Sequence, residues 1–428
     1  MSQNGSKPND SFVMNLVPSP PTTMSTHSST FDFRSYLQER TGYSSWIVEE
    51  LTGGSANHTV RVSRPNKPLS DERTTLERVS HPLKWSFGSV VMKQAPPYLA
   101  KSPEFPFSPK RQVIEAEALR FLHAHTSVSD LFKRNPNIRA PKLVHHDPFS
   151  HVLMQSDLGS HPNLYDILTS PTTTTVVASR LGRIVGNFLV DLGESLQGLA
   201  PQELQALQAR FQNDNSDQLL NDIIVQATDL LKEAEIPDAS VLRRRVLEHS
   251  YRDQRAAFGQ GDIWFGTILV ELRAEGNPIV GLCDWEFAGP TGFANDVAQL
   301  GAYLHILSES PLVSPQMKEN IIACAKEMYA AYLTVPRPSS FLRSLLIVHA
   351  WELLVAAGWK ARQYLWCSCP GDGLKCHHIR HYALEGAQLL RAAGDLSTGP
   401  DYDALSQLAW FSRTGFVSGL EAHLEPLS

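Results

Sequence analysis

Short β-type runs and one helical stretch alternate along the first part of the chain. Two such runs, SWIVEEL and HTVRV, flank the glycine-bearing segment LTGGSAN, a pattern that predicts a β-hairpin. A third run, SFGSVVMK, ends in Lys93. Pro109 opens KRQVIEAEALRFLHAH, whose apolar residues recur at helical spacing. The runs PKLVHH and HVLMQ surround the turn DPFS, and they complete a predicted small, mostly antiparallel sheet with one helix.

Beyond Ser156, helical spacing dominates the pattern. It is clearest in VASRLGRIVGNFLVDLGESL, SDQLLNDIIVQATDLLKEA and QMKENIIACAKEMYAAYL. One interruption lies between residues 259 and 285, where the β-type runs TILVEL and PIVGLC are joined by the turn RAEGN. Asp262 precedes this predicted hairpin, and Asp284 and Glu286 follow it. Three carboxylates can therefore converge on one spot, where they need a proton, a cation or a metal.

Length and composition divide the chain into a tail and two lobes. A chain of 428 residues that is 42% hydrophobic is too long for one ordinary core. Residues 1–30 are rich in Ser, Thr, Pro and Asn, so they are expected to form a disordered tail. We place residues 31–155 in an amino-terminal sheet lobe and residues 156–428 in a mainly helical lobe. The predicted fold class is α+β.

Charge and hydrophobicity exclude several classes of partner. The formal net charge of −6 gives no general attraction to nucleic acid or to an anionic membrane. The start, MSQNGSKPND, lacks the features of a secretory or transit peptide. The apolar stretch 344–359 is shorter than a membrane span and contains His349 and Glu352, so it predicts a buried helix. Five cysteines fit a reducing compartment, and we expect a cytoplasmic protein without nucleic-acid or membrane partners.

Three segments carry a resemblance to a known superfamily. They are VVMKQAPPYL around Lys93, SPKRQVIEAEAL before the helix and DWEFAGPTGFAND from Asp284. In order and rough spacing they resemble the strand, helix and metal-binding segments of the aminoglycoside phosphotransferase and choline kinase superfamily, and above all those of methylthioribose kinase. The resemblance covers about residues 45 to 300, so it identifies no acceptor-binding residues in the helical tail.

This resemblance implies a protein-kinase-like two-lobe fold and a phosphotransferase activity. The implied reaction moves a phosphoryl group from ATP, with Mg²⁺, to a hydroxyl of a small molecule. Lys93 would contact the α and β phosphates, and Glu115 would hold it by an ion pair. Glu117 is the competing partner, but it points about 200° around the helix from Glu115. We favour Glu115 because of its spacing to Leu119 and Leu122.

Two more segments resemble nucleotide contacts of the superfamily. A glycine-bearing loop would cover the phosphates, since missing side chains let backbone amides approach; taken alone, however, its GG pair is more often a plain turn. The resemblance places this loop at Gly53, Gly54, Ser55 and Asn57. The hinge whose backbone bonds adenine would follow the fifth strand, at Met154, Gln155 and Ser156.

The catalytic segment departs from the superfamily pattern HGDxxxxN at two positions. It reads GQGDIWFGT, with Gln260 and Thr267 in the outer positions and Asp262 as the implied base. Asp284 would be the main metal ligand and Glu286 the second. Thr267 is the implied third metal contact, although a hydroxyl is a poorer direct Mg²⁺ ligand than an amide oxygen. Methylthioribose kinase also carries a hydroxyl side chain there, so the departure is compatible with turnover.

Several alternatives remain open beside the kinase interpretation. A nucleotide-binding pseudokinase would keep the fold and lose efficient transfer through Gln260 and Thr267. A protein kinase is less favoured because no APE-type segment follows DWEF. The cluster CSCPGDGLKCHH contains zinc-type ligands, but its spacing is not that of a zinc finger, and a loop without metal is the preferred interpretation. Asp296 is expected to be a buried acceptor that braces the catalytic loop.

Overall fold

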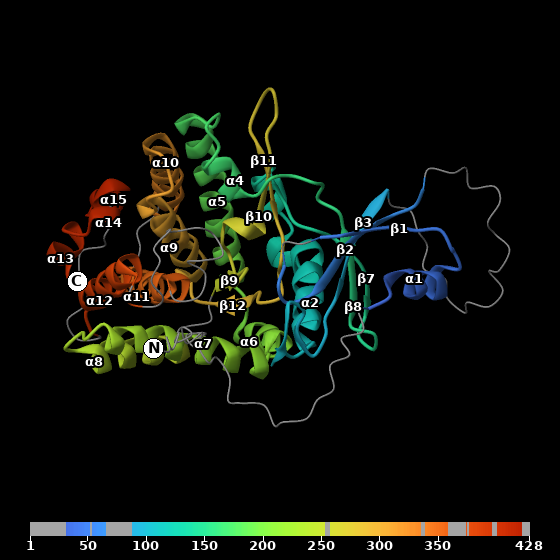
Figure 1. Cartoon of the computed structure of the whole chain (residues 1–428), viewed down its shortest axis with the longest axis horizontal. Coiled ribbons are helices and arrows are strands. Elements are labelled where there is room, and N and C mark those ends of the chain that lie inside the picture. The colour runs from blue at the N-terminus through green and yellow to red at the C-terminus, as the bar shows by residue number, and fades with distance from the viewer. Residues whose placement is uncertain are drawn as a thin grey trace, which may run out of the picture.

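The computed structural model describes residues 31–51, 54–65, 88–252, 257–334, 339–357, 374, 376–395 and 400–421. A small antiparallel sheet lies at one end of the molecule, and a larger body of helices lies at the other (Figure 1). The predicted α+β class and two-lobe arrangement are confirmed. The predicted disordered tail, residues 1–30, lies outside the described residues.

Five antiparallel strands form the sheet, in the order β1-β2-β3-β8-β7. They are β1 (Ile47–Glu50), β2 (His58–Ser63), β3 (Ser89–Gln94), β7 (Leu143–Asp147) and β8 (Val152–Ser156). Both predicted hairpins of this lobe are confirmed, because β1 pairs with β2 and β7 pairs with β8. The pleat sends alternate side chains to opposite faces. Val90, Met92 and Met154 therefore share one face, opposite to that of Lys93.

A helix that the sequence pattern missed covers this apolar face. Helix α1 (Phe33–Thr41) is capped by Asp32, whose side chain accepts from the first backbone amides, and it ends at Gly42 with φ 76°. Its buried Phe33, Tyr36 and Leu37 pack against the sheet. The sheet lobe thus contains α1 as well as the predicted helix, and the expectation of one helix was wrong. The short hairpin of β4 (Tyr98–Leu99) and β5 (Ser102–Pro106) was also missed.

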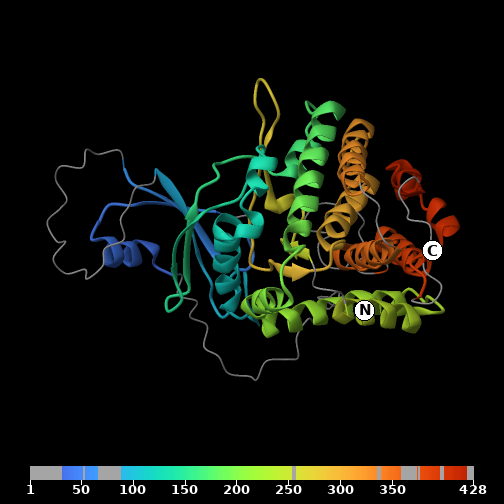
Figure 2. The ribbon, with the colours of Figure 1, turned by 180° about the vertical axis from the view of Figure 1, so that it is seen from behind.

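Helix α2 (Lys110–Ala124) is the predicted helix after Pro109, and it lies between the sheet and the helical body (Figure 2). Its first turn lies close to the segment that follows the end of β3. Glu115, Leu119 and Leu122 are buried on its inner side. Short elements η2 (Thr126–Val128), α3 (Leu131–Arg134) and β6 (Ile138–Arg139) follow.

The helical lobe begins after β8. Its helices are α4 (Leu164–Leu168), α5 (Thr175–Gly193), α6 (Pro201–Phe211), α7 (Asp214–Glu233), α8 (Ala239–Arg252), α9 (Asn295–Glu309), α10 (Pro315–Tyr332), α11 (Ser339–Val355), α12 (His377–Ala392), α13 (Tyr402–Ser406), α14 (Ala409–Arg413) and α15 (Phe416–Glu421). The three long predicted helices correspond to α5, α7 and α10. Residues 344–355 of the predicted apolar stretch lie in α11, and residues 358 and 359 lie outside the described part of the chain. Among the residues described, none of these helices is both long and apolar enough to cross a membrane.

The predicted hairpin of the helical lobe carries the acidic residues between the lobes. Strands β10 (Ile268–Glu271) and β11 (Ile279–Leu282) pair antiparallel, as predicted. Two features were not predicted: β6 pairs parallel to β11, and β9 (Ala257–Gly259) pairs with β12 (Gly289–Thr291). The β9–β12 pair holds the segment after Gly259 beside the segment before Gly289. The two acidic motifs are therefore neighbours in space.

Candidate active site

Lys93 and Glu115 form a buried ion pair between β3 and α2. The Nζ of Lys93 lies 2.7 Å from Oε1 of Glu115, and both side chains are almost completely buried. Glu117, the competing candidate, turns outward and pairs with Arg120 and Arg210. The helix spacing therefore brings Glu115, and not Glu117, to the lysine.

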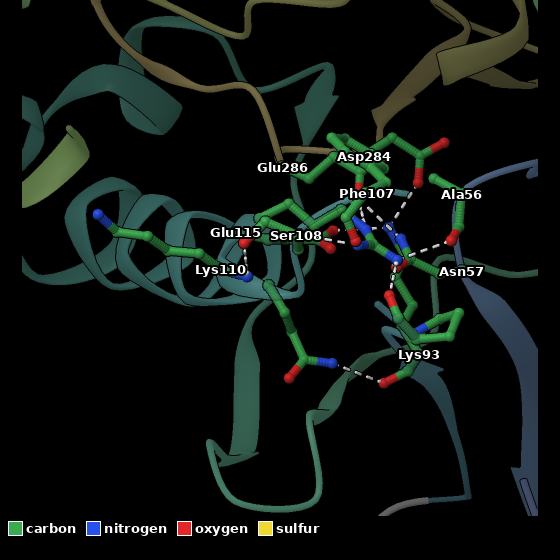
Figure 3. Close-up of polar contacts among 12 residues, drawn as sticks. Ala56, Asn57, Lys93, Phe107, Ser108, Lys110, Glu115, Asp284 and Glu286 are labelled. Carbon is green, nitrogen blue, oxygen red and sulfur yellow. Dashed lines mark hydrogen bonds and ion pairs between the residues drawn. The ribbon is translucent and has the colours of Figure 1, made fainter. Parts of the chain in front are cut away.

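Asp284 approaches the same ammonium group from the other lobe. Its Oδ1 lies 2.5 Å from the Nζ of Lys93, so one buried cation bonds to two carboxylates (Figure 3). Asp284 has a φ of 59°, a left-handed conformation that is uncommon for residues other than glycine. Backbone strain of this kind is concentrated at functional sites. The fold holds Asp284 in an unfavourable conformation at the point where the lobes meet.

Burial and charge shift the titration of this cluster. Burial pulls the pKa of Lys93 down, but the attraction of Asp284, Glu115 and Glu286 more than offsets it, and the pKa stands well above its usual value. Burial raises the pKa of Glu115 to about 7 in spite of the opposing effect of Lys93. Burial also raises the pKa of Glu286, against the effects of Lys93 and Arg111. The site thus concentrates negative charge that an added cation would relieve.

Glu286 is held by two residues of the sheet lobe. The Nδ2 of Asn57 donates to its Oε2 at 2.7 Å, and the Nε of Arg111 lies 3.7 Å from the same oxygen. Arg111 was not among the predicted site residues, although it lies within the motif SPKRQVIEAEAL. A charged residue in the first turn of a helix ordinarily faces solvent, and the two partners of Arg111 at this site, Asn57 and Glu286, lie far away from it in sequence. Only the spatial arrangement reveals its role.

The loop that contains Asp262 is organised by the side chain of Gln260. Its Oε1 accepts from the backbone N–H of Asp262 at 2.8 Å, and its Nε2 donates to the carbonyls of Cys283 at 3.0 Å and Asp284 at 2.5 Å. One amide therefore links the loop of Asp262 to that of Asp284. A side chain at Gly261, where φ is +84°, would place Cβ 2.1 Å from the carbonyl of Phe287. This close approach needs glycine.

Asp296 and Thr267 brace this loop from within. The carboxylate of Asp296 accepts from the amides of Gln260 at 2.7 Å and Gly261 at 3.1 Å, and burial raises its pKa. Asp296 is thus the buried acceptor that the sequence predicts. The hydroxyl of Thr267 donates to the carbonyl of Trp264 at 2.9 Å, and its side chain is buried. In this structure Thr267 stabilises the turn that follows Asp262, and its contact with a metal stays a prediction.

The predicted phosphate-covering loop lies next to this cluster. Gly54, Ser55 and Asn57 are described, whereas Gly53 lies outside the described residues. The carbonyl of Ser55 accepts from Lys101 at 3.1 Å, and the carbonyl of Ala56 accepts from Ala100 at 3.3 Å. The β4–β5 hairpin therefore supports the loop from one side, while Asn57 connects it to Glu286.

The three predicted hinge residues lie inside β8 rather than after it. Met154 and Gln155 belong to a strand with β3 on one side and β7 on the other. The amide of Ser156 donates to the carbonyl of Lys142 at 2.8 Å. Backbone groups inside such a ladder already have partners. Contact of these three residues with adenine stays a prediction.

Two tryptophans, two histidines and the C-terminal cysteine–histidine cluster lie elsewhere in the fold. Trp285 is fully buried and donates to the carbonyl of Leu282 at 3.0 Å, and Trp264 packs against Phe265 and Tyr303. His145 and His146 lie in β7. In the C-terminal cluster, Cys376, His377 and His378 are described, while Cys367 and Cys369 lie outside the described residues. Among the described residues, no three His, Cys, Asp or Glu side chains form a group able to hold a metal ion.

Asp284 and Glu286 nevertheless fit the way in which Mg²⁺ binds to phosphotransferases. Mg²⁺ is usually held by one or two carboxylates together with substrate phosphates, and it does not need a third acid. Asp284 keeps 38% of its side chain exposed and is therefore accessible. The carboxylate pair beside a lysine matches the donor set of a metal–triphosphate site.

Comparisons with known proteins agree with this geometry. The chain is 24% identical over 248 residues to a 4-hydroxytryptamine kinase of Psilocybe cyanescens. This alignment covers 56% of the chain and 62% of the relative. It is 28% identical over 223 residues to the methylthioribose kinase of Pectobacterium atrosepticum. This alignment covers 48% of the chain and 51% of the relative. The predicted resemblance to methylthioribose kinase is confirmed. The chain thus spans between about half and two thirds of these relatives.

Solved structures align with the chain at low sequence identity. A Plasmodium vivax ethanolamine kinase aligns with a TM-score of 0.41 and 13% identity, over 82% of both chains. The GDP complex of aminoglycoside 2'-phosphotransferase-IIIa aligns with a TM-score of 0.41 and 13% identity, over 81% of this chain and 91% of that one. No family model matches the chain.

Proposed function

We propose that this protein is an ATP- and Mg²⁺-dependent phosphotransferase that acts on a hydroxyl of a small molecule. The observation that carries the proposal is the ammonium group of Lys93, which bonds to Glu115 on α2 and to Asp284 from the helical lobe. Similarity to 4-hydroxytryptamine kinase and methylthioribose kinase, both named as kinases of small molecules, supports it. In this proposal residues 31–155 cover the nucleotide, and residues 156–428 supply the catalytic hairpin and the acceptor site.

Each charged residue has a defined role in the proposed reaction. Lys93 binds the phosphates, and Glu115 keeps its side chain extended toward them. Asp284 and Glu286 would hold Mg²⁺, which when bound neutralises the charge of the phosphates and orients them. To reach a metal, Asp284 has to share or exchange its contact with Lys93. The carboxylate of Asp262, which is half-buried, accepts the proton of the attacking hydroxyl.

The remaining segments position the nucleotide. Gly53, Gly54, Ser55 and Asn57 cover the phosphates, and the strand end at Met154, Gln155 and Ser156 lies against the adenine. Thr267 supports the loop of Asp262 and stands where a metal-binding amide is usual. The reducing cytoplasm is the proposed location, in keeping with the thiols of Cys283 and Cys324, which form no disulfide in the described part of the chain.

A nucleotide-binding pseudokinase is the second candidate, and the arrangement of Thr267 favours it. The hydroxyl of Thr267 forms its hydrogen bonds within the turn. Of the three proposed metal ligands, this leaves Asp284 and Glu286 to hold the metal. Such a protein would bind the nucleotide with little transfer. The two candidates share the nucleotide site and differ in turnover.

Two measurements test the proposal. ATP with Mg²⁺ should raise the melting temperature of the wild-type protein by mass action. A screen of hydroxylated metabolites, including 4-hydroxytryptamine and methylthioribose, should reveal an acceptor that stimulates ADP release. Asp262→Asn should keep the thermal shift and lose at least about 100-fold in turnover, whereas the exposed control Asp130→Asn should keep both.

The outcomes separate the candidates. A thermal shift without ADP release for any acceptor supports the pseudokinase. ADP release that persists in Asp262→Asn refutes the role of Asp262. No thermal shift with Mg²⁺ or Mn²⁺ contradicts both candidates.

A further inference from the structure

Arg111 is fully buried in the first turn of α2, one helical turn before Glu115. Its guanidinium donates to backbone carbonyls from three separate segments of the sheet lobe. These carbonyls belong to Ala56 at 2.8 Å, Pro96 at 3.0 Å, Tyr98 at 3.4 Å, Phe107 at 2.8 Å and Ser108 at 2.8 Å. The ring of Phe107 lies 4.5 Å from the guanidinium carbon. The planar fork of an arginine is suited to such a set of acceptors, and a lysine cannot reproduce it.

The sixth hydrogen bond of Arg111 leads to the candidate active site. Its Nε donates to Oδ1 of Asn57 at 3.0 Å, and the Nδ2 of Asn57 donates to Oε2 of Glu286 at 2.7 Å. A guanidinium has no acceptor, so only the oxygen of the Asn57 amide can face it. The amide nitrogen must then face Glu286. Arg111 therefore decides which way Asn57 points.

Arg111 also balances the charge of Glu286 directly. Its Nε lies 3.7 Å from Oε2 of Glu286, and both groups are buried. Carbonyl oxygens satisfy the donors of a buried guanidinium but cannot neutralise its charge. Figure 3 shows the carbonyls of Ala56, Phe107 and Ser108, Asn57 and Glu286 gathered in one network beside Lys93. The network joins the phosphate-covering loop, the start of α2 and the acidic segment of the helical lobe.

We propose that Arg111 is a positioning residue for the metal–nucleotide site: with Asn57 it holds the carboxylate of Glu286 in place for a divalent cation. This inference rests on the proposed function. A partner that orients a ligating carboxylate contributes about 10- to 100-fold to metal affinity. Arg111 contacts neither the phosphates nor the acceptor in this proposal, so its effect is expected on the cation.

The test measures Mn²⁺ binding by the full chain in the presence of a non-hydrolysable ATP analogue. Free Mn²⁺ is followed by its electron paramagnetic resonance signal, so turnover is not needed. Arg111→Lys and Asn57→Leu should each raise the Kd of Mn²⁺ about 10- to 100-fold. Asn57→Leu removes the bonds to Glu286 and to the Nε of Arg111 but keeps the arginine and its bonds to the five carbonyls, and it decides the matter if Arg111→Lys does not fold.

Gln112→Met is the matched control. Gln112 is the next residue on the same helix, is equally buried, and donates to the carbonyls of Lys93 at 3.0 Å and His151 at 2.5 Å. None of the hydrogen bonds described for the Gln112 side chain is with Glu286. Its replacement should lower the melting temperature and leave the Kd of Mn²⁺ within twofold of wild type.

Three results overturn the proposal. An unchanged Kd of Mn²⁺ in both Arg111→Lys and Asn57→Leu, with wild-type binding intact, overturns the role of Arg111 and leaves the proposed function standing. An equal rise in Gln112→Met shows that general loosening of α2 is the cause, and it also overturns the role. A wild-type chain that binds neither the nucleotide nor Mn²⁺ overturns the proposed function and this inference together.

Discussion

The Nζ of Lys93 and the Oδ1 of Asp284 lie 2.5 Å apart, although 191 positions of sequence separate the two residues. Lys93 comes from the central strand β3, and Asp284 follows β11 in the other lobe. The same ammonium group bonds to Glu115 at 2.7 Å. The lysine therefore joins both lobes through one buried charge, so its removal should affect stability as well as turnover.

Lys93→Met should abolish turnover and lower stability by about 3 kcal/mol, because removing one partner leaves buried carboxylates uncompensated. The loss of stability should be smaller at pH 6 than at pH 8. The pKa of Glu115 is already raised to about 7, and burial of the neutral acid costs less free energy than burial of the carboxylate. Chemical denaturation at the two pH values measures it. The double variant Lys93→Met with Glu115→Gln should be more stable than Lys93→Met but should remain without turnover. A double variant less stable than Lys93→Met would contradict the pairing.

Gln260 makes three bonds that couple the loops of Asp262 and Asp284. Gln260→Leu should lower both stability, by about 2 kcal/mol, and turnover, because it leaves buried backbone groups unpaired. Gln260→His should retain most of both, since a neutral imidazole offers one acceptor and one donor. Melting temperature and kcat measured on the two variants decide the matter. Equal behaviour of Leu and His at this position would show that these bonds do not organise the site.

Periodicity predicted the elements whose own residues carry a pattern. The hairpin of β10 and β11 and the long helices α5, α7 and α10 were all visible in the sequence. Strand β6 has two residues, Ile138 and Arg139, and pairs with β11 across more than a hundred residues, so no local pattern could reveal it. Helix α1 lies next to the predicted tail, and its short amphipathic pattern is weak.

The candidate site was predictable to the extent that its chemistry lies in motifs. Lys93, Asp284 and Glu286 stand in recognisable segments, and helix geometry separated Glu115 from Glu117. Arg111 could not be found in this way, because its partners are backbone carbonyls from segments that fold together only in the complete lobe. Backbone carbonyls are present at every residue, so their use as acceptors produces no pattern in the amino-acid sequence.

Helices α5 and α10 approach closely at Gly182. A Cβ there would lie 2.0 Å from the carbonyl oxygen of Cys324, which belongs to the backbone of α10 and cannot turn away. Gly182→Ala should destabilise the protein by about 2 kcal/mol or more, in spite of the better helix propensity of alanine. Gly386→Ala on α12 is the matched control, because its Cβ would meet the side chain of Leu354 at 3.3 Å and the backbone carbonyl of Ala350 at 3.4 Å, both much longer than the approach at Gly182. Its stability should change by less than about 1 kcal/mol. Similar losses in the two variants, measured by urea denaturation, would contradict this packing argument.

His349 is a buried imidazole whose protonation should limit stability at low pH. Burial, with a smaller effect of His305, holds the pKa of His349 well below its usual value. The Nε2 of His349 lies 3.1 Å from the Nδ1 of His305, and its Nδ1 lies 3.5 Å from the hydroxyl of Tyr329. On the far side, Glu385 faces the Nε2 of His305 at 3.2 Å. No described contact of His349 itself is with a carboxylate that could stabilise its charged form.

The sign of the pH effect follows from this depressed pKa. The unfolded chain binds a proton at His349 near pH 6.5 and the folded chain does not, so folding stability is complete above that pH and falls below it. The slope reaches about 1.4 kcal/mol per pH unit for one such group. His349→Gln should therefore lose less stability than wild type between pH 7.5 and pH 5.5, as measured by denaturation midpoints across that range. The exposed control His377→Gln should follow the wild-type profile. A His349→Gln profile parallel to that of wild type would show that the imidazole stays protonated or accessible in the folded protein.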